Sequence, residues 1–296
     1  MPNDRLKNYL HLHLIVFIWG FTAILGKLIS IEAIPLVWFR MLLAAIFIGC
    51  FFLFKKRIPS LNRKALWSML VVGIIIALHW VTFFEAIKVS NVSITLATMA
   101  TGSFFTAFLE PFWYRRKIIW YEVFFGISVV FGLYLIFIGD ISYSRGIGIA
   151  LISAFLAAIF TLMNGKLIKE YSPAVIGFYE LLGGFVFLSI YILFTDSISW
   201  KALHLNEQDI FFMLILASVC TAYAFIASVK VMRFLSPYTV MLTINLEPVY
   251  GILLALLIFG ESENMNSLFY SGAFIIVFTV IANGLLKNKQ KRIDKV

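Results

Sequence analysis

The sequence predicts an all-α membrane protein of ten transmembrane helices, arranged as two inverted five-helix repeats. Three observations lead to this fold class: the composition, the regular spacing of apolar runs, and a sequence pattern that occurs twice. Hydrophobic residues make up 62% of the 296 residues and charged residues 13%, with a mean hydropathy of +0.97. A soluble domain carries about 25% charged residues. A chain this apolar is therefore expected to be solvated by lipid.

The apolar runs each have about the 20 residues that a helix needs to cross the hydrocarbon core of a bilayer. A lipid-exposed backbone has to satisfy its own N–H and C=O groups, and the runs lack the alternation that a membrane barrel would need, so each is predicted to be helical. The first run is longer than a cleavable signal peptide and is interpreted as the first helix. The predicted spans are residues 10–31, 33–54, 65–87, 92–114, 118–138, 146–168, 173–194, 210–232, 237–259 and 267–286.

The basic residues predict the orientation of these spans. If the N-terminus is cytoplasmic, 19 of the 24 Lys and Arg residues lie in inner segments, Arg40 lies inside a helix, and four lie in outer segments: Lys27, Lys88, Arg145 and Lys201. The positive-inside rule then places both termini in the cytoplasm. The same distribution explains the net charge of +9, because basic residues facing an anionic inner leaflet need no nucleic-acid partner. Nucleic acid is therefore not expected as a partner.

The sequence offers little for metal, cofactor or redox chemistry. Cys50 and Cys220 both fall inside apolar runs, where a thiol acts as a small hydrophobe. There is no HExxH motif, no pair of Cys ligands, and no cluster of His, Asp and Glu at helical spacing. We therefore expect no metal and no cofactor, and predict that the chain is not an enzyme. An intramembrane enzyme and a scaffold stay as remote alternatives.

A pattern in the first span returns in the sixth at a constant offset of 139 residues. Phe21-Thr22 and the segment 26–29 match Phe160-Thr161 and the segment 165–168. After a longer loop the offset becomes 146, which pairs Ser90 with Ser236 and Gly126 with Gly272. The matched positions keep the same order along five spans, which indicates two copies of one unit.

The number of spans in each copy determines how the copies are inserted. Five is odd, so the second copy enters the membrane from the side opposite to the first. The result is a pseudo-two-fold axis in the membrane plane, an arrangement typical of secondary transporters. The predicted domains are residues 1–140 and 141–296.

Several short motifs occur in order along the chain: Trp19-Gly20, Arg40 with Ala44, Glu247-Pro248, Gly260-Glu261 and Gly272. In this order and spacing they resemble the drug/metabolite transporter superfamily, and specifically its ten-span family with two EamA-type domains. The resemblance implies a multi-pass protein of the bacterial cytoplasmic (inner) membrane that exports amino acids or related metabolites. It also implies a central cavity lined mainly by spans one to four and six to nine. The first repeat departs from the pattern, since Thr101-Gly102 occupies the position equivalent to Glu247-Pro248.

Polar residues inside the spans are the candidates for substrate binding or coupling. A charge near the bilayer centre costs about 2.5–3.5 kcal/mol on insertion scales, so it is expected to face the bundle interior or water. Glu247 lies near the middle of its span beside Pro248, which cannot donate a backbone hydrogen bond and predicts a helix kink. Together with Asn245, this carboxylate is a candidate to bind an ammonium group or to exchange a proton; the alternative is a structural kink.

Arg40 and Glu180 lie on equivalent helices of the two repeats, at depths that differ by about 10 Å, so a direct ion pair is not expected. The planar guanidinium of Arg40 suits a substrate carboxylate, and Glu180 suits proton coupling, with structural pairing as the alternative for each. His79, near mid-depth, is a candidate proton carrier or a packing residue. The aromatic candidates for the cavity wall are Trp19, Trp80, Tyr179, Tyr223 and Tyr250.

These residues favour transport by alternating access of a small zwitterionic or amphipathic metabolite. Efflux of cationic drugs is the alternative, because a carboxylate among aromatic side chains suits a cation. The expected partners are a small-molecule substrate and the lipid bilayer. The sequence leaves open whether transport is coupled to protons and whether the protein is a monomer or a homodimer.

Overall fold

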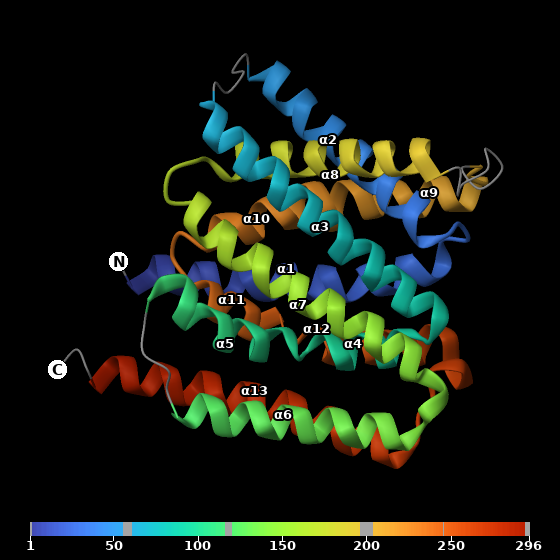
Figure 1. Ribbon diagram of the computed structural model, residues 1–296, viewed down its shortest axis with the longest axis vertical. Helices are drawn as coiled ribbons and strands as arrows, with labels where there is room; N and C mark the ends of the chain where they lie inside the picture. The colour runs from blue at the N-terminus through green and yellow to red at the C-terminus, as the bar shows by residue number, and fades with distance from the viewer. Residues whose placement is uncertain (1, 56–60, 116–119, 196–203, 245, 294–296) are drawn as a thin grey trace.

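The computed structural model describes residues 2–55, 61–115, 120–195, 204–244 and 246–293, and within these ranges it contains helices and turns but no strand (Figure 1). The α-helices are α1 (Pro2–Leu28), α2 (Ala33–Phe54), α3 (Arg63–Val89), α4 (Val92–Met99), α5 (Gly102–Tyr114), α6 (Trp120–Gly139), α7 (Ser144–Leu167), α8 (Pro173–Thr195), α9 (Glu207–Ala217), α10 (Ala224–Val231), α11 (Pro237–Ile244), α12 (Glu247–Phe259) and α13 (Ser267–Ile293). Two 3₁₀ turns, η1 (Ile141–Tyr143) and η4 (Gly260–Glu263), and a π-helix, η3 (Ser218–Tyr223), complete the described elements. The all-α prediction is confirmed for this part of the chain.

Seven helical stretches of the described chain are long and apolar enough to cross a membrane, and they correspond to the predicted spans one to four and six to eight. The fifth and tenth predicted spans contain shorter apolar stretches, Phe124–Gly139 and Ser267–Thr279. The ninth is divided between α11 and α12. The chain is thus a multi-pass membrane protein, and ten as the number of spans stays a prediction.

Asparagine side chains begin three of the helices. Asn62, Asn91 and Asn206 each accept a hydrogen bond from the backbone N–H three residues later, at 2.8, 2.8 and 2.7 Å. This is the capping arrangement that satisfies an N–H group left over at a helix start. The capped helices are α3, α4 and α9.

The fourth predicted span is interrupted, although we expected a continuous helix there. α4 ends at Met99 and α5 begins at Gly102. Two hydroxyl groups bond to carbonyls near the break, with Thr101 Oγ1 donating to Thr98 O at 2.8 Å and Ser103 Oγ to Ala100 O at 3.1 Å. The kink predicted at Pro248 is present as the division between α11 and α12. Both broken helices lie at equivalent places in the two repeats, at the offset of 146 residues.

Helices from the two halves of the chain alternate in space (Figure 1). α2 packs against α8, α6 packs against α13, and α3 packs against both α7 and α8. α1 in turn contacts α10 and α12, α4 contacts α12, and α5 contacts α11. In Figure 1, α6 and α13 run in opposite directions along one side of the molecule, and the two termini lie at the same edge. The halves are therefore interleaved and do not form two separate bundles.

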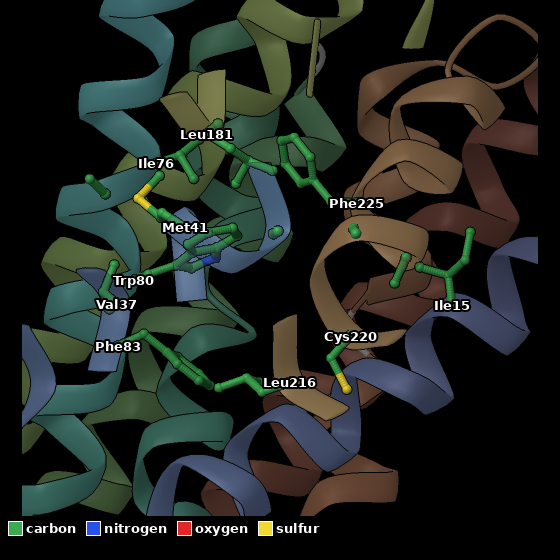
Figure 2. Packing of buried hydrophobic residues seen from close by; sticks show 14 of the residues in the cluster. Ile15, Val37, Met41, Ile76, Trp80, Phe83, Leu181, Leu216, Cys220 and Phe225 are labelled. Atoms are coloured by element: carbon green, nitrogen blue, oxygen red, sulfur yellow. The ribbon is translucent and has the colours of Figure 1, made fainter. Parts of the chain in front are cut away.

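Small residues let the helix backbones approach closely where α3 crosses α8. A methyl group at Gly73 would overlap the carbonyl oxygen of Glu180, so only glycine fits there. Membrane helices use small residues at such contacts because dispersion, and not hydrophobic burial, drives their packing. Beside this crossing Met41, Ile76 and Leu181 gather from α2, α3 and α8 (Figure 2). The result is a tightly packed wall on one side of the molecule's interior.

Candidate functional site

A cavity lies where helices from both halves of the chain meet. Its empty space, including the part open to solvent, is about 850 Å³. Side chains from α1, α2, α3 and α4 face side chains from α7, α10, α11 and α12 across it. Most of the wall is aromatic or aliphatic, and its polar members are Thr22, Arg40, His79, Thr161, Ser228 and Glu247.

Arg40 presents an incompletely bonded guanidinium to this cavity. Its side chain is only 1% exposed, and its Nε donates a 2.6 Å hydrogen bond to Thr221 Oγ1. The guanidinium carbon lies 3.8 Å from the centre of the Trp80 ring, a cation–π contact. Its Nη1 is buried and has no hydrogen-bond partner among the described residues. A fixed cation with an unused donor is suited to bind an anionic group.

The π-helix η3 supplies the partners that fix two residues of the cavity wall. Thr221 Oγ1 accepts from Arg40 and donates to Leu216 O, five residues back, at 2.7 Å. The carbonyl of Cys220 accepts a 3.1 Å hydrogen bond from Trp19 Nε1. A π-helix widens one turn and is frequent at functional sites. Here it orients side chains that come from α1 and α2 of the other half.

His79 is held by Ser153 of α7. The Ser153 hydroxyl donates to the His79 carbonyl at 2.8 Å, and His79 Nδ1 lies 2.8 Å from Ser153 Oγ and 3.0 Å from Ser153 O. The Ser153 hydroxyl hydrogen is bonded to the backbone carbonyl of His79, and the Ser153 carbonyl can only accept. These contacts therefore assign the ring proton to Nδ1. Nε2 is then the acceptor of the neutral ring. The ring also packs 5.3 Å from that of Phe160.

Glu247 begins α12 and lines the same cavity as Arg40. The start of a helix carries a partial positive charge, which stabilises a carboxylate. No ion pair of 4.0 Å or less joins Glu247 to Arg40, and the Glu247 carboxylate has no hydrogen bond among the described residues. Pro248 also lines the cavity. The cavity therefore holds a guanidinium and a carboxyl group, each with unused hydrogen-bonding capacity.

Four candidates from the sequence lie outside this cavity. Tyr223 is exposed and hydrogen-bonds to His11, Tyr250 packs against Phe17, and Tyr179 packs against Phe178. Glu180 is fully buried in α8, where Asn164 donates to it at 3.3 Å. The sequence predicted that the seventh span, which is α8, lines the cavity. Among the described residues α8 packs against α3 and contributes no lining side chain. Asn245 lies outside the described residues.

A second buried charge lies near the end of α12. Glu263 is fully buried and accepts from Lys27 Nζ at 2.7 Å and from the backbone N–H groups of Val92 and Ser93 at 3.1 and 2.9 Å. It therefore joins α1 and the start of α4 to η4. The sequence analysis singled out Glu261 in this segment, yet that side chain is exposed.

The EamA-like transporter family model matches residues 6–138 and again 144–284. The chain belongs to this family. An uncharacterised transporter of Archaeoglobus fulgidus is a relative of this EamA-like protein, 23% identical over 223 residues that cover 66% of this chain and 79% of the other. A crystal structure of a protein 12% identical in sequence has a TM-score of 0.68 and covers 96% of this chain and 98% of that one. That likeness concerns the fold alone.

Several cavity residues of this EamA-like protein escaped the sequence analysis. Thr22 and Thr161 both line the wall, and they are the two threonines that the 139-residue offset pairs. The repeat was thus a signal that could have identified them. Thr221 and the methionines of the wall carry no such signal, because their roles depend on contacts between distant helices.

Proposed function

We propose that this EamA-like transporter is a secondary transporter that exports small zwitterionic metabolites such as amino acids. The observation that carries the proposal is the pair of unused charges in one cavity. Arg40 offers a donor to a substrate carboxylate, and Glu247 offers a carboxylate to a substrate ammonium group. The aromatic and aliphatic wall between them suits an apolar side chain. The substrate is thereby neutralised at both ends inside an otherwise apolar site.

Transport is proposed to occur by alternating access between two inverted repeats. Support comes from the contacts: α2 packs against α8 and α6 against α13, so helices pair with their own counterparts, as a two-fold axis requires. The contact of α4 with α12 has its counterpart in that of α11 with α5. Discontinuous helices near the centre of the membrane form the substrate sites of many transporters. Both breaks border the cavity here, at Ala100 and at Glu247.

The proposed location is the bacterial cytoplasmic membrane, with ten spans and both termini in the cytoplasm. The 19 basic residues assigned to inner segments support this orientation. The two ends of the chain also lie at one edge of the molecule (Figure 1). The proposed partners are the exported metabolite and the surrounding lipid.

The test is export of amino acids from cells that overproduce the protein. Amino acids in the medium are quantified for the wild type, Glu247→Gln and the matched control Glu261→Gln, which changes an exposed glutamate. A hydrogen bond to a charged group contributes about 1.5–3 kcal/mol, so Glu247→Gln is expected to weaken substrate binding about ten- to hundredfold. Equal export by the two glutamine variants, at equal protein levels, would overturn the role of Glu247.

Efflux of cationic drugs is the second candidate, supported by Glu247 among aromatic side chains. The two functions differ in their need for Arg40. A zwitterion exporter should lose export with Arg40→Gln, whereas a cation exporter should not need a buried guanidinium. Resistance to cationic dyes that survives Arg40→Gln but not Glu247→Gln would favour drug efflux over amino-acid export.

A further inference from the structure

We propose that Glu180 is a proton-binding site, occupied in this conformation by a proton that closes a cyclic pair of hydrogen bonds with Asn164. Glu180 lies in α8 and Asn164 in α7, and neither side chain is exposed. The site lies behind the cavity wall. It is independent of the substrate-binding charges of Arg40 and Glu247.

The hydrogen bonds of the pair are complete only with a proton on the carboxyl group. Asn164 Nδ2 donates to Glu180 Oε2 at 3.3 Å, while Glu180 Oε1 and Asn164 Oδ1 are both buried without a partner. Two oxygens that only accept cannot bond to each other. A proton on Oε1 turns that oxygen into a donor to Oδ1. One proton thus satisfies both of the unpaired atoms.

No positive charge compensates an ionised Glu180. Arg40 on α2 is bonded to Thr221 and lies over Trp80, and His79 on α3 is bonded to Ser153. The other ionisable groups of the neighbouring elements are Tyr179 and Tyr191 of α8 itself, Cys50 of α2, Cys220 of η3, and groups near helix ends: Lys55, Arg63, Lys64, Glu85, Lys88, Arg145, Lys166 and Lys230. None of the ion pairs within the described chain involves Glu180. Burying an unpaired carboxylate is costly enough that the group binds a proton instead.

The packing around Glu180 links this proton to the position of the helices. Gly73 of α3 lies directly against the Glu180 backbone and leaves no room for a methyl group. Asn164 is one helical turn beyond Phe160 and Thr161, which line the cavity. When the proton leaves to water entering from the cavity, a bare carboxylate is left buried beside Asn164 of α7. Ionisation therefore favours conformations in which water reaches the Glu180 carboxylate between α7 and α8.

Infrared spectroscopy of the full chain in lipid nanodiscs tests the proposal without any substrate. The wild type at neutral pH should show a C=O stretch of a protonated carboxyl group that disappears in Glu180→Gln and persists in Glu247→Gln. Glutamine reproduces the donor and acceptor of the neutral acid, so Glu180→Gln is expected to fold. Asn164→Leu keeps the acid and removes its partner, and should shift the band to higher frequency. A wild-type spectrum in which Glu180→Gln removes no such band overturns the proposal.

A second readout is thermal stability as a function of pH. The folded state keeps the Glu180 proton at pH values where the unfolded state has already lost it, so the unfolding temperature of the wild type should fall as pH rises from about 4.3, the ordinary pKa of a glutamate, through neutrality. The curve of Glu180→Gln should be flatter than that of the control Glu261→Gln. Parallel curves for the two variants would contradict the proposal. Failure of the amino-acid export test leaves these results unaffected, so the two proposals can fail separately.

Discussion

Glu263 should be among the most costly side chains to remove, although it lies outside the proposed substrate site. Its carboxylate accepts three hydrogen bonds, from Lys27 Nζ and from the backbone N–H groups of Val92 and Ser93. The glutamate is fully buried, while the Lys27 side chain is 27% exposed. Glu263→Ala therefore leaves two N–H groups at the start of α4 without their acceptor, and leaves Lys27 Nζ with only the 3.3 Å hydrogen bond to Ser262 Oγ.

The expected loss follows from these partners. Removing one partner of a buried ion pair costs about 3–5 kcal/mol, and losing the acceptor at a helix start about 0.5–2 kcal/mol. Lys27 keeps some access to water, so we expect Glu263→Ala to lower the free energy of unfolding by about 3–5 kcal/mol in total. Lys27→Met should cost less, about 1.5–3 kcal/mol, because the backbone N–H groups still bind Glu263.

The assay is denaturation of the purified protein in mixed micelles with increasing SDS, followed by circular dichroism. Glu261→Ala is the matched control, since it removes an exposed carboxylate two residues away and should change stability by less than about 0.5 kcal/mol. Equal losses for Glu263→Ala and Glu261→Ala would refute the reasoning. Equal losses for Glu263→Ala and Lys27→Met would show that the bonds to α4 contribute nothing.

Two further predictions use the same assay. Thr221→Val leaves Arg40 Nε without its acceptor and should cost about 1–3 kcal/mol, while Thr221→Ser keeps the hydroxyl and should cost clearly less; equal losses would contradict this role. Gly73→Ala places a methyl group against Glu180 and should cost about 1–3 kcal/mol, whereas Gly148→Ala, which meets open space in α7, should be neutral or stabilising by up to about 1 kcal/mol. A similar result for the two alanine variants would exclude close packing as the cause.

Hydropathy predicted the class of fold because lipid imposes the same length and apolarity on every crossing helix. It could not predict how those helices are interrupted. The break before Gly102 depends on hydroxyl groups that bond to nearby carbonyls, and a threonine or serine does the same within intact helices. The π-helix η3 depends on Trp19 and Arg40, which approach it from other helices. Neither contact leaves a local pattern in the sequence.

The sequence predicted the candidate site best for ionisable side chains, because burying such a group in a membrane span costs free energy. Arg40, His79 and Glu247 were found by that rule, and all three line one cavity. The tyrosine candidates Tyr179, Tyr223 and Tyr250 were selected by residue type and depth alone. Which side of a helix faces the interior depends on its neighbours, and in a lipid-facing chain an exposed aromatic residue carries no penalty that would reveal its direction. The sequence analysis missed Glu263 for the same reason, because its partners lie on other helices, α1 and α4.

Two pairs of residues that the repeat relates form the same kind of contact. Lys27 and Lys166 are equivalent at the 139-residue offset, and Trp113 and Phe259 at the 146-residue offset. Lys27 Nζ lies 4.3 Å from the ring centre of Phe259, and Lys166 Nζ lies 5.1 Å from that of Trp113. The same cation–π contact therefore occurs twice, once in each repeat.

Glu263 has no equivalent acidic residue in the first repeat. Its counterpart at the 146-residue offset is Lys117, a residue of the opposite charge, and Lys166 forms no ion pair among the described residues. Separating the helices at the Lys27 end breaks a buried ion pair and the hydrogen bonds from Val92 and Ser93 to Glu263. Separating them at the Lys166 end breaks cation–π contacts between partly solvated groups. In the proposed alternating-access cycle, the two halves therefore differ in the contacts that must break for either end to open.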